Sequence, residues 1–302
     1  MMQRIPVCHN GPIFSRFIYG WWRLAEWKMS AADIQQRIED CLSLGITTHD
    51  HADIYGDFAC EPLFGQALKQ APHLREKIEL VSKCGIQLVS DRRPQHKSKS
   101  YNTTKSHIIQ SAENSLKEMS TDYLDVLLIH RPDPLMCADE VAEAFSELNT
   151  SGKVKYFGVS NFTPRQFDLL QSRLAFPLVT NQVEVSVLHL PPLTDGTLDQ
   201  AQQLGRCPMA WSSLAGGRLF SDTTTRASHV RTALEEVGNN LGGAHLDQVA
   251  LSWLLKHPAN ILPIIGSGSW ERIESAVSSA KLQMSREDWY QIYEASAGQE
   301  LP

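Results

Sequence analysis

The sequence predicts an α/β chain that folds as a single (β/α)8 TIM barrel over residues 1–302, with an N-terminal hairpin and extra outer helices. Short apolar runs alternate with amphipathic segments along the chain, which is typical of strands joined by helices in a parallel sheet. Eight such runs can be counted, and this number favours a closed barrel over an open doubly wound sheet. No GxGxxG fingerprint follows the first strand, so the usual support for an open dinucleotide-binding sheet is missing.

The predicted strands are short apolar runs bounded by turn or polar residues. In chain order they are Phe17–Gly20, Ile46–Asp50, Ile78–Lys83, Leu124–His130, Val154–Ser160, Leu178–Glu184, Pro208–Ser213 and Ile261–Gly266. The connections between them are too long for hairpins, so we expect neighbouring strands to be parallel.

The predicted helices have start signals and apolar faces. Ser30 with Asp33 three residues later predicts a capping box, and Gly45 ends that helix. Thr163 before Pro164, with Gln166 as its partner, predicts a second start of this kind. Apolar residues recur at helical spacing in four segments: Ile34, Ile38, Cys41 and Leu42; Ile108, Ala112, Leu116 and Met119; Val141, Phe145 and Leu148; and Phe167, Leu170 and Leu174.

Three segments lie outside this repeat. Asn10-Gly11 predicts the turn of a short hairpin ahead of the barrel. Residues 86–102 form a polar insertion after the third strand, where barrel enzymes place substrate loops, although a solvated loop without a role is an equal alternative. Residues 246–257 predict an extra helix with a structural role outside the barrel, and the chain after the eighth strand is long enough for two more helices.

Composition narrows the partners to small molecules. The chain is 42% hydrophobic and 21% charged, with a net charge of -6 and no long basic run, so we expect no nucleic-acid or membrane partner. It has no apolar stretch of spanning length and no signal peptide at Met1–Pro12, so a cytoplasmic location is expected. The six cysteines are scattered without a CxxC pair, which favours reduced thiols over disulfides or a zinc ribbon.

Ionisable side chains follow successive predicted strands at their carboxyl ends, where barrel enzymes place catalytic residues. Asp50 and Tyr55 follow the second strand, Lys83 ends the third and His130 ends the fourth. A single lysine or histidine there is more often structural. Four such residues on successive strands indicate one pocket.

Three segments carry a resemblance to the aldo-keto reductases. The run Asp50-His51-Ala52-Asp53-Ile54-Tyr55-Gly56 resembles the family's Asp-x-Ala-x-x-Tyr-Gly signature, and Leu127–Pro132 resembles its histidine strand. Gly152-Lys153-Val154, followed by Phe157–Phe162, is similar to a third family segment. The resemblance covers essentially the whole chain. The stretch Leu128–Leu135, with Arg131 after the histidine, most resembles the bacterial YdhF-type branch.

The resemblance implies reversible reduction of an aldehyde or ketone to an alcohol by a nicotinamide cofactor. Hydride addition leaves an alkoxide that must be protonated, and Tyr55 is the expected general acid. A free phenol has a pKa of about 10 and is a weak acid at neutral pH. We expect Lys83 to lower that pKa, Asp50 to keep Lys83 charged, and His130 to donate a hydrogen bond to the carbonyl oxygen.

The resemblance also implies a cofactor site. Ser160, Asn161 and Gln182 match the family's partners for the nicotinamide carboxamide, and Trp211 stands where an aromatic residue stacks on the nicotinamide ring, with barrel core as the alternative. The pyrophosphate loop corresponds to residues 212–218, namely Ser212, Leu214, Gly216, Gly217 and Arg218. At the adenosine end, Ser267 and Arg272 remain, but the family's lysine, glutamate and asparagine are missing. NADP(H) is therefore favoured and NAD(H) stays possible.

The expected substrate walls are Trp21, Trp22, Tyr55, Arg131 and residues 86–102, and they specify no particular molecule. Two other functions remain open. His49 and His51 match the His-x-His of metal-dependent barrel hydrolases, but side chains alternate along a strand, so the pocket receives either these histidines or Asp50. The second is a non-catalytic regulatory subunit of the same fold. Our prediction is the reductase with no metal, and the family precedent favours a monomer.

Overall fold

The structure is a computed structural model that describes residues 2–301 and divides into two compact units, 1–182 and 183–302. The first unit contains β1 (Arg4–Pro6), β2 (Ile13–Ser15), β3 (Ile18–Gly20), α1 (Leu24–Trp27), α2 (Ala31–Ser43), β4 (Thr48–Asp50), α3 (Tyr55–Phe58), α4 (Cys60–Gln70), η1 (Pro72–Lys77), β5 (Glu79–Cys84), β6 (Ile86–Gln87), β7 (Ser100–Tyr101), α5 (Lys105–Glu118), β8 (Leu124–Ile129), α6 (Ala138–Thr150), β9 (Val154–Ser160), α7 (Pro164–Gln171) and the start of β10 (Leu178–Glu184).

The second unit begins at the end of β10 and contains the rest of the chain. It contains η2 (Pro191–Leu193), α8 (Thr197–Gln203), β11 (Met209–Trp211), η3 (Ala215–Gly217), α9 (Arg218–Ser221), α10 (Thr225–Asn240), α11 (Leu246–Lys256), β12 (Leu262–Ile265), α12 (Trp270–Ser278), η4 (Ser279–Lys281) and α13 (Arg286–Ala297). No helix within residues 2–301 is both long and apolar enough to cross a membrane.

Eight strands form a closed parallel barrel in the order β10-β11-β12-β3-β4-β5-β8-β9, which confirms the predicted fold class. All eight predicted runs contain a barrel strand, although most strands are shorter than predicted, as with β11 and β12. That the chain is one domain stays a prediction.

The hairpin and the helix starts follow the local sequence signals. Arg4 pairs with Ser15 across β1 and β2, and Asn10 takes a positive φ of 57° in the connecting turn. Ser30 and Asp33 form the predicted capping box of α2, and Thr163 and Gln166 form that of α7. These caps satisfy backbone N–H groups that the first helical turn would leave without partners.

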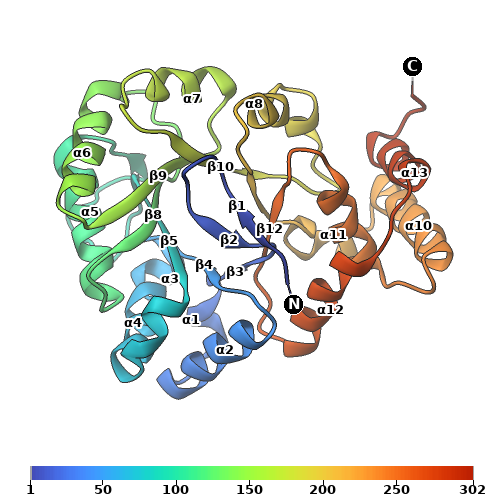
Figure 1. Cartoon of the computed structure of the whole chain (residues 1–302), viewed down its shortest axis with the longest axis horizontal. Helices are drawn as coiled ribbons and strands as arrows, with labels where there is room; N and C mark the ends of the chain where they lie inside the picture. The colour runs from blue at the N-terminus through green and yellow to red at the C-terminus, as the bar shows by residue number, and fades with distance from the viewer. Residues whose placement is uncertain (1, 302) are drawn as a thin grey trace. The chain divides into compact units, whose positions relative to one another are not determined.

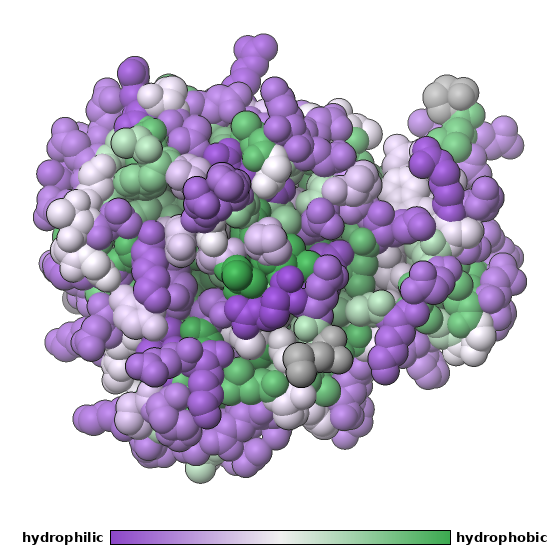
Figure 2. Space-filling model, viewed as in Figure 1, coloured by the Kyte–Doolittle hydropathy of each residue, from purple (hydrophilic) through white to green (hydrophobic). Residues whose placement is uncertain are grey.

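The helices of the first unit cover the strands that lie next to them in sequence. Figure 1 shows α5 and α6 side by side on the outer side of β8 and β9. Their apolar faces are buried, and Figure 2 shows a mostly hydrophilic surface over the outer helices of this unit. On α4, Gly65 lies so close to the end of α5 that an added Cβ would stand 2.0 Å from the backbone oxygen of Glu118.

The polar insertion after β5 contains a small hairpin of its own, which the sequence did not predict. Ile86 pairs with Tyr101 and Gln87 with Ser100, so β6 and β7 bring the two ends of the insertion together. The residues between them are exposed or partly buried.

The second unit is stabilised by an aromatic pair between α11 and α13. The rings of Trp253 and Trp289 stack with centroids 4.9 Å apart and planes 5° from parallel. Each indole N–H donates to the backbone oxygen of the other residue at 3.1 Å. This fits the structural role predicted for residues 246–257. No sequence signal had indicated α10, which packs beside α13 (Figure 1).

Candidate active site

Lys83 is the centre of a buried polar cluster at the carboxyl ends of β4 and β5. Its ammonium donates to both carboxylate oxygens of Asp50, at 2.9 and 2.8 Å, and to the Tyr55 hydroxyl at 3.0 Å. A further bond of 2.7 Å goes to the backbone oxygen of His51. The Lys83 side chain is 0% exposed and that of Asp50 is 4% exposed, so this ion pair has little access to water. The structure thus brings together three of the four predicted catalytic residues.

The protonation states follow from burial and from this ion pair. Burial raises the pKa of Tyr55 above its ordinary value, and the Lys83 ammonium opposes that rise. For Lys83, burial alone would lower the pKa, but Asp50 and Tyr55 outweigh it and the pKa is raised. Tyr55 therefore keeps its proton and Lys83 its charge at neutral pH. The expected net lowering of the Tyr55 pKa is not found, because desolvation of the phenolate outweighs the attraction of the ammonium.

His130 follows β8 and faces Tyr55. Its ring lies edge-on to the Tyr55 ring, with centroids 5.9 Å apart. Burial lowers the pKa of His130 well below the ordinary value, and the charges of Lys83 and Arg131 lower it further, so the imidazole is neutral. The ring atom Nδ1 is buried and has no hydrogen-bond partner among the described residues. A neutral imidazole beside the phenol is suited to orient a carbonyl oxygen.

Tyr55 begins a tight left-handed turn. Gly56, Asp57 and Phe58 have φ values of 59°, 54° and 63°, a conformation that costs a residue with a side chain about 1–2 kcal/mol. Glycine is required at position 56 on a second ground, because an added Cβ would stand 2.7 Å from both Ala25 Cβ and Cys60 Sγ. This turn lets the chain leave β4 and place the phenol beside Lys83.

The three predicted carboxamide-binding residues lie together at the ends of β9 and β10. Ser160 donates its hydroxyl to the backbone oxygen of Gln182 at 2.9 Å, and the Asn161 amide donates to that hydroxyl at 2.8 Å. The Gln182 amide donates to Asp50 Oδ1 at 2.7 Å. Gln182 therefore connects this trio directly to the Asp50 carboxylate, a contact that no sequence signal had indicated.

Trp21, His49 and His51 face away from the catalytic cluster. In the register of β3 and β4, Gly20 pairs with Asp50, so alternation places Trp21 on the face of the two histidines. The Trp21 ring stacks on that of His51 and donates its N–H to His49 Nδ1 at 3.0 Å, and it is 0% exposed. This placement removes Trp21 from the candidate substrate wall. It also packs the histidine pair of the hydrolase alternative against aromatic rings, with Asp50 on the catalytic side.

Trp22 and Arg131 remain as candidate wall residues. The Trp22 side chain is 56% exposed, and the Arg23 guanidinium lies 5.1 Å from its ring centre. Arg131 directly follows His130 and is partly buried, and its positive charge contributes to the lowered pKa of that histidine.

In the second unit, a loop of unusual backbone geometry follows β11. Trp211 ends the strand and is partly buried. Four residues of the loop have positive φ, namely Ser212, Ala215, Gly216 and Gly217. An added Cβ on Gly217 would have no heavy atom within 4 Å, so its backbone is open to a ligand. Leu214 is partly buried, and Arg218 begins α9, where it bonds to Ala215 and Glu184. The backbone N–H groups of Ala215 and Gly217 are used within the loop, where they donate to the backbone oxygens of Ser212 and Leu214 at 2.6 and 3.0 Å. The open backbone at Gly217 is what makes this loop a candidate for holding a pyrophosphate.

The predicted adenosine-side residues lie at the start of α12. The Ser267 hydroxyl accepts from the backbone N–H of Ser269, which caps the helix. Arg272 stands in the first turn with an exposed side chain. A helix N-terminus with an arginine beside it is suited to a phosphate group.

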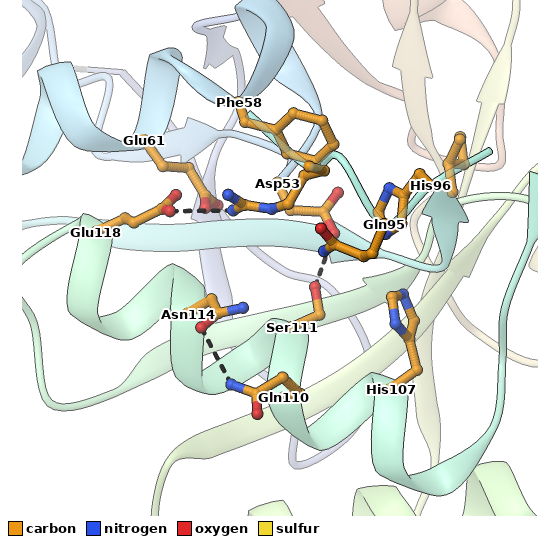
Figure 3. Close-up of a pocket in the computed structure, with 12 residues that line it drawn as sticks. Asp53, Phe58, Glu61, Gln95, His96, His107, Gln110, Ser111, Asn114 and Glu118 are labelled. Carbon is orange, nitrogen blue, oxygen red and sulfur yellow. Dashed lines mark hydrogen bonds and ion pairs between the residues drawn. The ribbon is translucent and has the colours of Figure 1, made fainter. Parts of the chain in front are cut away.

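Two buried carboxyl groups, those of Asp53 and Glu61, lie near the cluster around Lys83 and were not predicted from the sequence. Asp53 accepts from Ser111 at 2.7 Å, and Glu61 accepts from Ser82, the neighbour of Lys83. Burial raises the pKa of Asp53 to about 7 and that of Glu61 to about 8. Both line a pocket of about 100 Å³ on the outer side of β5 (Figure 3). For Glu61 the available signal was a charged residue among the apolar residues of α4.

Comparisons with known proteins agree with this arrangement. The model of the aldo/keto reductase family matches residues 16–297. Oxidoreductase YdhF of Escherichia coli (strain K12) is 55% identical over 302 residues, which are 100% of both chains. The 6-dehydroglucose reductase of Agrobacterium fabrum is 45% identical and covers 99% of this chain and 100% of that one. The crystal structure of the thermostable aldo-keto reductase Tm1743 with the inhibitor epalrestat matches with a TM-score of 0.81 and 26% identity, over 97% and 100% of the two chains.

Proposed function

The chain belongs to the aldo/keto reductase family, and we propose that it reversibly reduces an aldehyde or ketone to an alcohol with NADP(H), using Tyr55 as the general acid. The relatives that are 55% and 45% identical are named an oxidoreductase and a reductase. The observation that carries this proposal is the buried Lys83 ammonium bonded to both Asp50 and the Tyr55 hydroxyl.

The proton moves from the Tyr55 hydroxyl to the oxygen of the substrate. Lys83 stabilises the phenolate that forms, because its ammonium lies 3.0 Å from the phenol oxygen. Asp50 keeps Lys83 charged and oriented, and the neutral His130 ring orients the carbonyl oxygen. In the oxidation of an alcohol the same groups act in reverse, with Tyr55 accepting the proton.

A bound nicotinamide cofactor supplies the hydride. The residues that would hold its carboxamide are Ser160, Asn161 and Gln182, while Trp211 would stack on the ring and the loop of residues 212–218 would bind the pyrophosphate. Ser267 and Arg272 support the preference for NADP(H), because an exposed arginine at a helix N-terminus favours the additional 2′-phosphate.

A polyhydroxy aldehyde is the substrate class that we propose to test first. Two relatives, 45% and 38% identical, are named 6-dehydroglucose reductases. The exposed Trp22 indole offers a flat apolar face and Arg131 a hydrogen-bond donor, and both suit a sugar-like molecule. We also retain monomeric and cytoplasmic states as predictions; size-exclusion chromatography tests the first and cell fractionation the second.

The test replaces Tyr55 by Phe, which removes one hydroxyl and keeps the ring. With NADPH and 6-dehydroglucose, or the best carbonyl of a panel, turnover should fall by about 10²–10⁴-fold, the usual worth of general acid catalysis. Cofactor affinity should stay unchanged. Tyr123→Phe is the matched control and should be fully active, because this partly buried tyrosine precedes β8 at the strand end opposite to His130.

Near-normal turnover in folded Tyr55→Phe would refute the proposed acid. If the parent protein binds NADPH but turns over no aldehyde, ketone or quinone, the regulatory-subunit alternative is correct instead.

A further inference from the structure

The polar insertion of residues 86–102 reaches the turn that carries Tyr55. The guanidinium of Arg93 lies over the Phe58 ring, 4.7 Å from its centre. The His96 ring covers the same phenylalanine, with centroids 6.4 Å apart. Phe58 is 4% exposed and is the last residue of the left-handed turn that begins at Tyr55. The insertion therefore contacts the catalytic turn at its far end.

Arg93 is itself held by α5. It forms an ion pair with Glu118 at 3.2 Å, and both side chains are only about a quarter exposed, at 26% and 24%. In Figure 3, Phe58 and Asp53 lie over the same pocket, with Glu118 at its side and the dashed line of this ion pair ending on Glu118. A guanidinium that is both paired and stacked has little freedom to move.

The near end of the same segment is also fixed to α5. Asp53, two residues before Tyr55, accepts a hydrogen bond from Ser111, and its backbone N–H donates to the backbone oxygen of Lys83 at 3.1 Å. The positive charge of Arg93 acts on the Asp53 carboxyl and opposes the rise of its pKa. Residues 53–58 are thus held at both ends, with Tyr55 between the two attachments.

We propose that Arg93 is a positioning residue for the reaction. Its guanidinium, paired with Glu118 of α5, holds the Phe58 ring in place and so keeps the left-handed turn that sets the Tyr55 hydroxyl at Lys83. This inference rests on the proposed role of Tyr55 as the acid. It assigns a function to residues 86–102 that is separate from the substrate wall.

The physical reason lies in the turn. Three consecutive residues with positive φ persist only where the surrounding structure prevents them from relaxing. Without the guanidinium, Phe58 loses its cover and the turn can rotate toward common backbone angles. Tyr55 would then leave its hydrogen bond with Lys83, while the carboxamide and phosphate sites lie on other segments and stay as they are.

The experiment compares Arg93→Ala, Arg93→Lys and Arg286→Ala in the full chain, using NADPH and the best carbonyl substrate. Arg286 is the matched control, because its guanidinium also lies over an aromatic ring, 5.3 Å from the centre of Tyr290, but the residue is exposed. We expect Arg93→Ala to lower kcat by about 10–100-fold, since a displacement of about 1 Å in a catalytic group can cost 10²-fold. The Kd of NADPH should change little. Arg93→Lys should recover part of the loss, and Arg286→Ala should match the parent.

A second readout is rescue by methylguanidinium at millimolar concentration. It should raise the kcat of Arg93→Ala but not that of the parent or of Tyr55→Phe, because the pocket of about 100 Å³ can admit so small a cation beside Glu118 and Phe58. Phe58→Leu, which keeps Arg93 and removes only the stacked ring, provides an independent variant if Arg93→Ala folds poorly. It should show the same loss of kcat without rescue.

The proposal is overturned if folded Arg93→Ala and Phe58→Leu both keep the parental kcat, or if activity falls only in proportion to the unfolded fraction measured by circular dichroism. Tyr55→Phe separates the two claims. If that variant is inactive while Arg93→Ala is normal, only the positioning role fails. If Tyr55→Phe is active, the proposed acid itself fails.

Discussion

Replacing Lys83 by Met should destabilise the first unit to an extent that follows from the burial of its ion pair. Methionine replaces the aliphatic stem and removes the ammonium, which leaves the Asp50 carboxylate buried without its cation. Breaking a buried pair in this way costs about 3–5 kcal/mol. Asp50 keeps the 2.7 Å bond from Gln182, so we expect the lower end, about 3 kcal/mol. For a unit the size of residues 1–182, this corresponds to a melting temperature lower by about 6–12 °C.

The double variant Asp50→Asn/Lys83→Met tests the cause. It removes both charges, so its loss should be smaller than the sum of the two single losses by about 1–3 kcal/mol. Thermal unfolding followed by circular dichroism measures all the variants. Lys153→Met is the matched control: its ion pair with Glu113 is also short, at 2.6 Å, but 39% and 41% exposed. It should cost no more than about 1 kcal/mol. If Lys83→Met has the same melting temperature as Lys153→Met, the reasoning from burial is wrong.

Three further predictions concern the cofactor and pH. Arg272→Ala should narrow the affinity gap between NADPH and NADH by about 1–3 kcal/mol, measured by titration, and equal affinities in the parent protein would contradict the 2′-phosphate assignment. NADP⁺ should quench part of the intrinsic fluorescence, and Trp211→Ala should remove that part; an unchanged quench would place Trp211 in the core. Burial raises the pKa of Glu61 from 4.5 to about 8. The stability that this carboxyl gives to the fold is therefore complete below about pH 4.5 and is lost as the pH rises through 8. Glu61→Gln should then raise the melting temperature more at about pH 9 than at about pH 5. An equal change in melting temperature at the two pH values would show that the Glu61 carboxyl does not lose its proton in this range.

The catalytic cluster was predictable because barrel geometry brings the ends of neighbouring strands together. Asp50 ends β4 and Lys83 is the last residue but one of β5; the two strands pair in parallel, so the proximity of these residues follows once the strands are recognised. The capping boxes of α2 and α7 were predictable for a more local reason, since a serine or threonine and its partner three residues later are enough to define the cap.

The remaining contacts depend on register and on side-chain length. Trp21 was expected in the substrate wall, but pairing of Gly20 with Asp50 turns it to the opposite face. The hydrogen bond from Gln182 to Asp50 joins residues 132 positions apart, and no spacing rule connects them. Arg93 reaches Phe58 from an insertion that has no periodic pattern, so its contact appears only once the loop is folded.

The close approach of α4 and α5 has a consequence for protein engineering. In a saturation library selected for activity, position 65 should be depleted of every substitution, although it holds no chemical group. Any side chain there would meet the backbone of Glu118 and push α5 outward, together with the carboxylate that pairs with Arg93. Tolerance to mutation where α4 meets α5 is thus limited by this buried glycine. Loop redesign of residues 86–102 should keep both Gly65 and the end of α5 unchanged.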